Sequence, residues 1–197
     1  WLAHNQDGPY WWQQNVAHNH ARFQVPVAHL GGWYDIFLKG TLDQYQAMAA
    51  VAARSPRRPP HLLVGPWTHS SFLRCQGEVD FGPDASSADL GGTGGLNAEH
   101  LRWFDATLKG DDRGLVGVPP VRLFVMGENR WRSYDHYPVP ATRVEDWHLH
   151  PGGGLRRDPA RLSRPDHFSY DPADSVPTQG GSTMLPPRWP PGPVDQQ

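Results

Sequence analysis

The sequence predicts an α/β region followed by a region of short β-strands, and three observations support this. Short apolar runs occur at 25–30 and 61–65, and apolar residues recur at helical spacing between them. Two strands joined by a helix in this way are typical of a parallel sheet. From residue 119 onward, short alternating segments are separated by turn clusters rich in glycine and proline. Such a pattern favours an antiparallel β-sandwich.

The first strand and the helix after it are predicted from residues 25–54. The run 25–30 is short, apolar and bounded by proline and glycine, which predicts a strand buried on both faces. Gly31 and Gly32 follow, and we expect them to form a tight turn. Asp35 then lies just past the carboxyl end of the strand. Apolar residues at helical spacing across 36–54 predict a helix with one face on the sheet.

The second strand, 61–65, leads in the same way to His69. In open α/β sheets the ligand crevice lies outside the carboxyl ends of the strands. An acid followed in chain order by a histidine is also the second half of the Ser, Asp, His order of α/β-hydrolases. We therefore expect Asp35 and His69 to lie within about 2.6–3.2 Å, or slightly further apart without ligand. As alternatives, Asp35 could cap the helix, and His69 could be a loop histidine beside Trp67.

The rest of the sequence predicts one more helix, followed by a region of short strands. Residues 71–96 are irregular and rich in glycine. Residues 97–108 have the spacing of an amphipathic helix, and Gly110 after them is a favoured C-terminal cap. A linker at 111–114 precedes a strand expected at 121–126, which we assign to the β-sandwich.

Composition and charge exclude several classes of protein. The 197 residues are enough for one domain or two small ones. The 18 basic and 20 acidic side chains are well mixed along the sequence. No concentration of basic residues therefore indicates binding to nucleic acid. No apolar run reaches the roughly 18 residues of a membrane span, and no signal peptide is visible. We therefore expect no nucleic-acid partner and no membrane partner, and we favour the cytoplasm over secretion.

No cofactor and no metal site is predicted. Cys75 is the single cysteine of the sequence, which excludes an internal disulfide framework and a cysteine-based zinc site. His18 and His20 could suggest metal ligands. A helix is predicted across 10–20, however, and residues two positions apart on a helix point to different faces.

Several short motifs follow one another in a specific order and spacing. They are Gly32–Asp35, Gly65–Ser70, Trp103–Asp105 with Leu108–Gly110, and Val125–Gly127 with Trp131–Arg132. Together they resemble the cocaine-esterase and Xaa-Pro dipeptidyl-peptidase family of serine hydrolases. Members of that family pair an α/β-hydrolase domain with a C-terminal jelly-roll β-sandwich. The resemblance implies that 1–110 is the C-terminal part of an α/β-hydrolase domain. It also implies that 118–197 is the N-terminal part of a jelly-roll, galactose-binding-like sandwich.

The resemblance also implies roles for individual residues. His69 would be the general base and Asp35 the acid that orients it. Trp33 and Phe37 resemble the aromatic wall of the family's substrate pocket, although both could equally be core residues. The substrate would be a small ester, amide or peptide, and a homo-oligomeric parent protein is left open.

A nucleophile is not found in this sequence. No Gly-x-Ser-x-Gly motif occurs, and Ser70 and Ser71 are too near His69 in the chain to lie opposite its ring. The chain also begins without methionine. We therefore expect it to be a fragment of a longer serine hydrolase, inactive by itself. The alternative is a noncatalytic β-sandwich binding module or a degenerate hydrolase.

Overall fold

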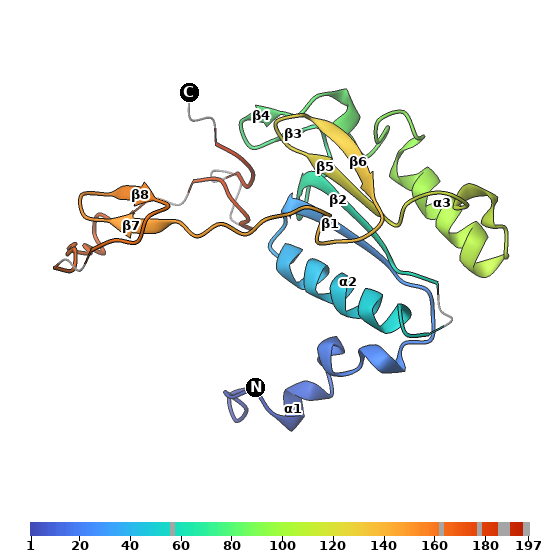
Figure 1. Cartoon of the computed structure of the whole chain (residues 1–197), viewed down its shortest axis with the longest axis horizontal. Coiled ribbons are helices and arrows are strands. Elements are labelled where there is room, and N and C mark those ends of the chain that lie inside the picture. Colours follow the sequence, from blue (N-terminus) through green and yellow to red (C-terminus); the bar gives the residue numbers. More distant parts are fainter. Residues whose placement is uncertain (56–57, 162–163, 177–178, 185–189, 195–197) are drawn as a thin grey trace. The chain divides into compact units, whose positions relative to one another are not determined.

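The computed structural model describes residues 1–55, 58–161, 164–176, 179–184 and 190–194. The chain divides into two compact units, one from the described parts of Trp1–Tyr137 and Gln179–Gln197, the other from those of Pro138–Thr178. The first unit contains a four-stranded sheet with two long helices, and the second contains a β-hairpin (Figure 1). Within the described ranges, no helix has the length and apolar character needed to cross a bilayer.

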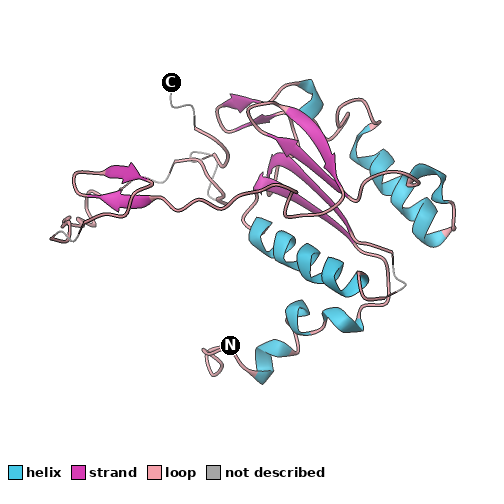
Figure 2. Ribbon diagram, in the orientation of Figure 1, coloured by secondary structure: helices cyan, strands magenta, loops and turns pink. Residues whose placement is uncertain are grey.

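The sheet of the first unit, whose strands are magenta in Figure 2 and labelled in Figure 1, has the strand order β1-β2-β5-β6. Its strands are β1 (Ala28–Tyr34), β2 (His61–Thr68), β5 (Val121–Val125) and β6 (Arg130–Tyr134). The first three are parallel, and β5 pairs with β6 in antiparallel orientation. The sheet is therefore mixed, and its carboxyl-terminal edge is formed by β1 and β2 side by side.

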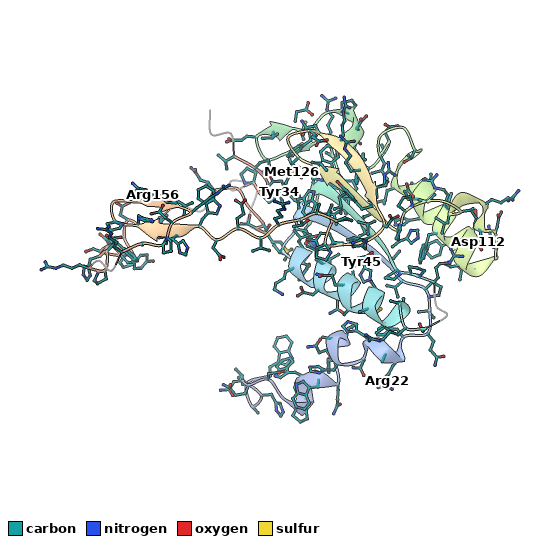
Figure 3. All side chains as sticks on the ribbon, in the orientation of Figure 1. Arg22, Tyr34, Tyr45, Asp112, Met126 and Arg156 are labelled. Carbon is teal, nitrogen blue, oxygen red and sulfur yellow. The ribbon has the colours of Figure 1, made fainter. Side chains whose placement is uncertain are left out.

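Two long helices pack on opposite faces of this sheet. Helix α2 (Leu38–Ala52) carries the buried Tyr45, which is labelled in Figure 3. The Tyr45 ring lies against that of His29, with centroids 5.9 Å apart. Helix α3 (Gly95–Leu108) places Trp103 against His61, at 4.7 Å. Because Ala28 pairs with His61 and successive strand residues face opposite sides, His29 and His61 point to different faces. The predicted strand–helix–strand unit is present, with its helix covering one face.

The glycines of β1 do not form the predicted turn. Gly31 and Gly32 lie inside the extended strand, and Gly32 is paired with Gly65 of β2. A Cβ on Gly32 would lie 2.2 Å from the carbonyl oxygen of Trp67, and one on Gly65 would lie 2.4 Å from the Trp67 ring. The two glycines are needed because the backbones and the Trp67 indole approach closely there. Their role is close packing, not chain reversal.

The strand predicted to open the sandwich belongs to the sheet instead. Leu62 of β2 pairs with Val121 of β5, and the first compact unit continues to Tyr137. The predicted boundary between 110 and 118 is therefore not where the structure divides. Val121, Leu123 and Phe124 are all buried, because β5 lies between β2 and β6 under packed side chains. An alternating start followed by an apolar end fits such a strand as well as it fits a sandwich strand.

A cluster of aromatic side chains lies beside the carboxyl end of β2. Phe81, Ala85 and Phe124 form its buried centre, and Trp131 of β6 packs against them. Phe81 follows a short hairpin of β3 (Cys75–Gln76) and β4 (Val79–Asp80). Ala85 ends the 3-10 helix η3 (Pro83–Ala85). The cluster attaches the segment after His69 to the sheet.

The remaining elements are short. In place of one helix across 10–20, the structure has α1 (Pro9–Trp12), η1 (Val16–His18) and η2 (His20–Arg22). Asn15 interrupts the helix because its side chain accepts a hydrogen bond from the Ala17 backbone N–H at 2.9 Å, as asparagine commonly does at caps. The 3-10 helix η4 (Asp112–Gly114) follows α3, and the second unit contains the hairpin of β7 (His148–His150) and β8 (Gly154–Arg156).

Candidate active site

Asp35 and His69 meet at the carboxyl-terminal edge of the sheet. Asp35 follows β1 and His69 follows β2, and these strands are parallel neighbours. Nδ1 of His69 lies 3.2 Å from Oδ1 and 3.3 Å from Oδ2 of Asp35. The contact expected from the sequence is present. The Asp35 side chain is 17% exposed and that of His69 is 37% exposed, so the acid is covered while the imidazole reaches the surface.

The Asp35 carboxylate is held by the start of helix α2. Its Oδ1 accepts a hydrogen bond from the Phe37 backbone N–H at 2.8 Å. The capping role considered as an alternative and the contact with His69 therefore occur together. A carboxylate is an acceptor only, so its partner on the imidazole is Nδ1–H. That leaves Nε2 as the basic nitrogen of a neutral ring.

The His69 ring has one aromatic neighbour and one open side. Phe37 packs its ring against the imidazole, with centroids 5.0 Å apart and planes at 75°. In the part of the chain that the structure describes, Nε2 of His69 has no hydrogen-bond partner. A base placed in this way can accept a proton from a nucleophile that approaches from the open side.

The two aromatic residues predicted to line a pocket have different surroundings. Phe37 contacts His69 and is 58% exposed. Trp33 instead donates a hydrogen bond from Nε1 to the carbonyl oxygen of Phe124 at 2.7 Å, and so ties β1 to β5. The structure brings Phe37 to the acid–base pair, while the one polar group of Trp33 is used within the sheet. That either residue contacts a substrate stays a prediction.

Sequence reasoning missed one residue beside this pair. Gln76 in β3 is 2% exposed, and its side-chain amide bonds to the chain segment on both sides of His69. A single glutamine in a polar, glycine-rich stretch gives no signal of this kind. Its partners are backbone atoms, which every residue has.

A cavity of about 690 Å³ lies elsewhere, on the α3 face of the sheet. Leu30, Leu63 and Trp103 contribute its apolar lining. Its charged groups are already paired, since Glu99 lies 2.6 Å from Arg122 and 2.9 Å from Arg102. Neither Asp35 nor His69 lines it. We place the candidate site at Asp35 and His69, because an oriented base with an open nitrogen is found there.

Burial affects the protonation of two strand histidines. Burial, and then the nearby His20, lower the pKa of His29 below its ordinary value of 6.5. Burial, and then Arg58, lower the pKa of His61, with a smaller opposing effect of Glu99. The unfolded chain therefore takes up protons at a higher pH than the folded chain does. It follows that the contribution of these two neutral histidines to the free energy of unfolding is fully present above about pH 6.5. This contribution is lost as the pH falls through their folded-state pKa.

We expect His29→Gln to make the fold less sensitive to acid. The neutral amide cannot take up a proton, so the stability lost on going from about pH 7 to about pH 5 should be smaller than in the unaltered chain. The measurement is the free energy of unfolding in urea at both pH values. His136→Gln, at an exposed position, controls for the loss of a histidine. An unchanged pH dependence in His29→Gln would exclude His29 as a source of acid sensitivity.

Comparisons with known proteins agree with the motifs. Residues 1–71, which include both Asp35 and His69, match the family model described as X-Pro dipeptidyl-peptidase (S15 family). The chain is 34% identical over 182 residues to cocaine esterase from Rhodococcus sp., an alignment that covers 88% of this chain and 30% of the esterase. A candidate serine esterase from Mycobacterium bovis is 40% identical over 98 residues, which are 50% of this chain and 14% of that protein.

A solved structure shows the same fold. An aminopeptidase from a marine sediment archaeon, Thaumarchaeota archaeon, matches with a TM-score of 0.69 and 24% sequence identity, over 92% of this chain and 29% of that one. The chain therefore spans about 30% of the length of cocaine esterase and 29% of the aminopeptidase.

Proposed function

We propose, from the confirmed resemblance to the cocaine-esterase and X-Pro dipeptidyl-peptidase family, that this chain supplies the acid and the base of a serine hydrolase. Asp35 is the acid and His69 is the base. The observation that carries the proposal is the 3.2 Å contact between His69 Nδ1 and Asp35 Oδ1 at the ends of two adjacent parallel strands. The nucleophilic serine comes from a part of the protein outside this sequence.

The geometry supports a two-step proton transfer. His69 Nε2 takes the proton of the serine hydroxyl as the serine oxygen attacks the carbonyl carbon of the substrate. Asp35 accepts the Nδ1–H bond throughout and stabilises the imidazolium that forms. The imidazolium then gives its Nε2 proton to the departing alkoxide or amine, leaving an acyl-enzyme. Water repeats the sequence and releases the acid, so the base is regenerated.

The proposed substrate class is a small ester or amide. Phe37 stands beside the base and is largely exposed, so it can offer an apolar contact to the group that is cleaved or transferred. The relatives are named as esterases and as a dipeptidyl-peptidase family, which supports this class. We also propose that a jelly-roll sandwich follows the sheet. The antiparallel hairpin of β7 and β8 supports this proposal, because a jelly roll is built from antiparallel strands.

A fluorophosphonate probe tests the proposed function, because it reacts with a serine only when a histidine base activates it. We expect the longer protein that contains this chain to be labelled stoichiometrically at one serine, and its His69→Ala variant to be unlabelled. The 197-residue chain should be unlabelled and should not hydrolyse a p-nitrophenyl ester above the imidazole background. Labelling of Ser70 or Ser71 in that chain would contradict an external nucleophile. A longer protein without any labelling would indicate a degenerate hydrolase or a binding module.

A further inference from the structure

Gln76 has a side chain that is buried and fully used. It lies in β3, seven positions after His69, and it is 2% exposed. Its Oε1 accepts a hydrogen bond from the Thr68 backbone N–H at 3.3 Å. Its Nε2 donates to the carbonyl oxygens of Leu73 at 2.8 Å and Ser71 at 3.1 Å, and to the Ser71 hydroxyl at 3.2 Å. The amide oxygen of Gln76 therefore bonds to the residue that precedes His69 in the chain, and the amide nitrogen bonds to residues that follow it.

These bonds close a loop without regular secondary structure, which is also tied down by the Ser87 N–H donating to the Phe72 carbonyl oxygen at 2.9 Å. Between Thr68 at the end of β2 and Cys75 at the start of β3, the chain forms neither helix nor strand. Buried backbone groups need partners, and leaving one unpaired is costly. The Gln76 amide provides three of these partners from one side chain. It fixes the path of the backbone that presents the imidazole.

Gln76 is itself held from outside the loop. The backbone of Gln76 pairs with that of Val79 across the β3–β4 hairpin. The turn of that hairpin is covered by the C-terminal segment, where Glu78 N–H donates to the Pro193 carbonyl oxygen at 3.0 Å. Gly77, at φ +53°, leaves no room for a Cβ, which would lie 2.3 Å from the same oxygen. The hairpin that carries Gln76 is therefore held at its turn by the C-terminal segment as well as by its own pairing.

We infer that Gln76 is a positioning residue for His69, acting through the backbone of residues 68–73. The distances from His69 Nδ1 to the two Asp35 oxygens are 3.2 and 3.3 Å, at the long end of the hydrogen-bond range. A change in the path of this loop would therefore change the contact between His69 and Asp35 directly. The inference rests on the proposed function only for the role of His69 as the base. The clamp between Gln76 and the loop does not depend on it.

The proton position on His69 is the readout that separates positioning from general stability. In the intact site, Asp35 favours the neutral ring with its proton on Nδ1. Removal of the Gln76 amide should release the loop and let the proton move to Nε2. We expect Gln76→Ala to lower the ratio of the Nδ1–H to the Nε2–H tautomer about fivefold, the factor that one hydrogen bond of ordinary net strength contributes. The ratio is measured by ¹⁵N NMR on the 197-residue chain with labelled histidine.

Two further variants make the comparison specific. Gln46→Ala removes a glutamine whose Nε2 donates to the Leu42 carbonyl on α2 at 3.4 Å, away from the loop, and should leave the His69 tautomer ratio unchanged. Gln76→Glu keeps the shape and the acceptor but replaces the N–H donors by oxygen, so it should lower the ratio as Gln76→Ala does. An unchanged ratio in a folded Gln76→Ala chain overturns the inference. Equal changes in Gln76→Ala and Gln46→Ala overturn it as well.

A measurement on the unaltered chain covers the case in which the Gln76 variants do not fold. Hydrogen exchange of the Gln76 side-chain amide and of the Thr68 backbone N–H, which are both buried and belong to one hydrogen-bonded pair, should report one opening event, with protection within about threefold. Protection of the Gln76 amide about tenfold or more below that of the Thr68 N–H overturns the inference. These experiments need no nucleophile and no turnover. The proposed function fails on probe labelling alone, and the role of Gln76 fails on the tautomer and exchange data alone.

Discussion

Asp35→Asn is expected to lower the turnover number of the longer protein about 10⁴-fold with the fold intact; this magnitude is that of the trypsin-type triad. In the wild-type chain, Asp35 Oδ1 accepts a hydrogen bond from the Phe37 backbone N–H at 2.8 Å. The carbonyl oxygen of an asparagine can accept the same hydrogen bond, so the start of α2 keeps its cap. The side-chain NH₂ would then face His69. Because an NH₂ donates, it favours the tautomer with a bare Nδ1 and a proton on Nε2. That ring cannot take the serine proton.

The measurement is the turnover number for a p-nitrophenyl ester beside the thermal midpoint of each purified variant. His69→Ala should show a loss of similar size, because triad members act as a unit. Asp43→Asn is the matched control, since it removes the same charge from an exposed aspartate that pairs with Lys39 on α2. Its turnover should stay within about twofold of the unaltered protein. Near-full activity in Asp35→Asn would mean that the acid lies elsewhere.

The pair of Asp35 and His69 could be predicted because its signals are local and ordered. Each residue follows an apolar run of strand length, and a helical pattern separates the runs. Parallel strands joined by one helix bring their carboxyl ends to the same edge. The residue types then suffice to predict the site, because a carboxylate and an imidazole at that edge match the Asp and His of the Ser, Asp, His order of α/β-hydrolases.

Two features of the fold could not be predicted because they depend on contacts far apart in the sequence. Gly31 and Gly32 have the composition of a turn, and only the position of Trp67 shows why a strand needs a glycine at residue 32. The strand at 121–125 has a pattern that suits a sandwich or a sheet. Its pairing with β2, some sixty residues earlier, decides between them. Periodicity reports which face of a strand is buried, not which strand lies beside it.

Gln76 lay outside sequence reasoning for a different reason. Histidine and aspartate have chemistry that suggests a role, whereas an amide side chain is an ordinary hydrogen-bonding group. Its position matters because the hairpin that carries it folds back on the loop after β2. Only the three-dimensional path of residues 68–80 shows this.

The largest effect on stability is expected at Gly32. The β-carbon of Gly32→Ala would lie 2.2 Å from the Trp67 carbonyl oxygen and 2.7 Å from its carbonyl carbon. Backbone atoms in a paired strand cannot rotate away as a flexible side chain can, so β1 and β2 must separate. Overpacking of this kind typically costs about 1–3 kcal/mol, occasionally more. We expect about 3 kcal/mol, near the upper end, measured as the loss in free energy of unfolding in urea.

Gly40→Ala is the matched control for this change. Gly40 is exposed on α2, and a Cβ there would meet nothing within 4 Å, so alanine should stabilise the helix by up to about 1 kcal/mol. The two substitutions add the same methyl group and should have opposite signs. Because Gly32 lies three positions before Asp35, separation of β1 from β2 should also lengthen the contact with His69. A Gly32→Ala chain that kept its urea midpoint would show that the paired strands can absorb the methyl group, and that this close approach does not fix the site.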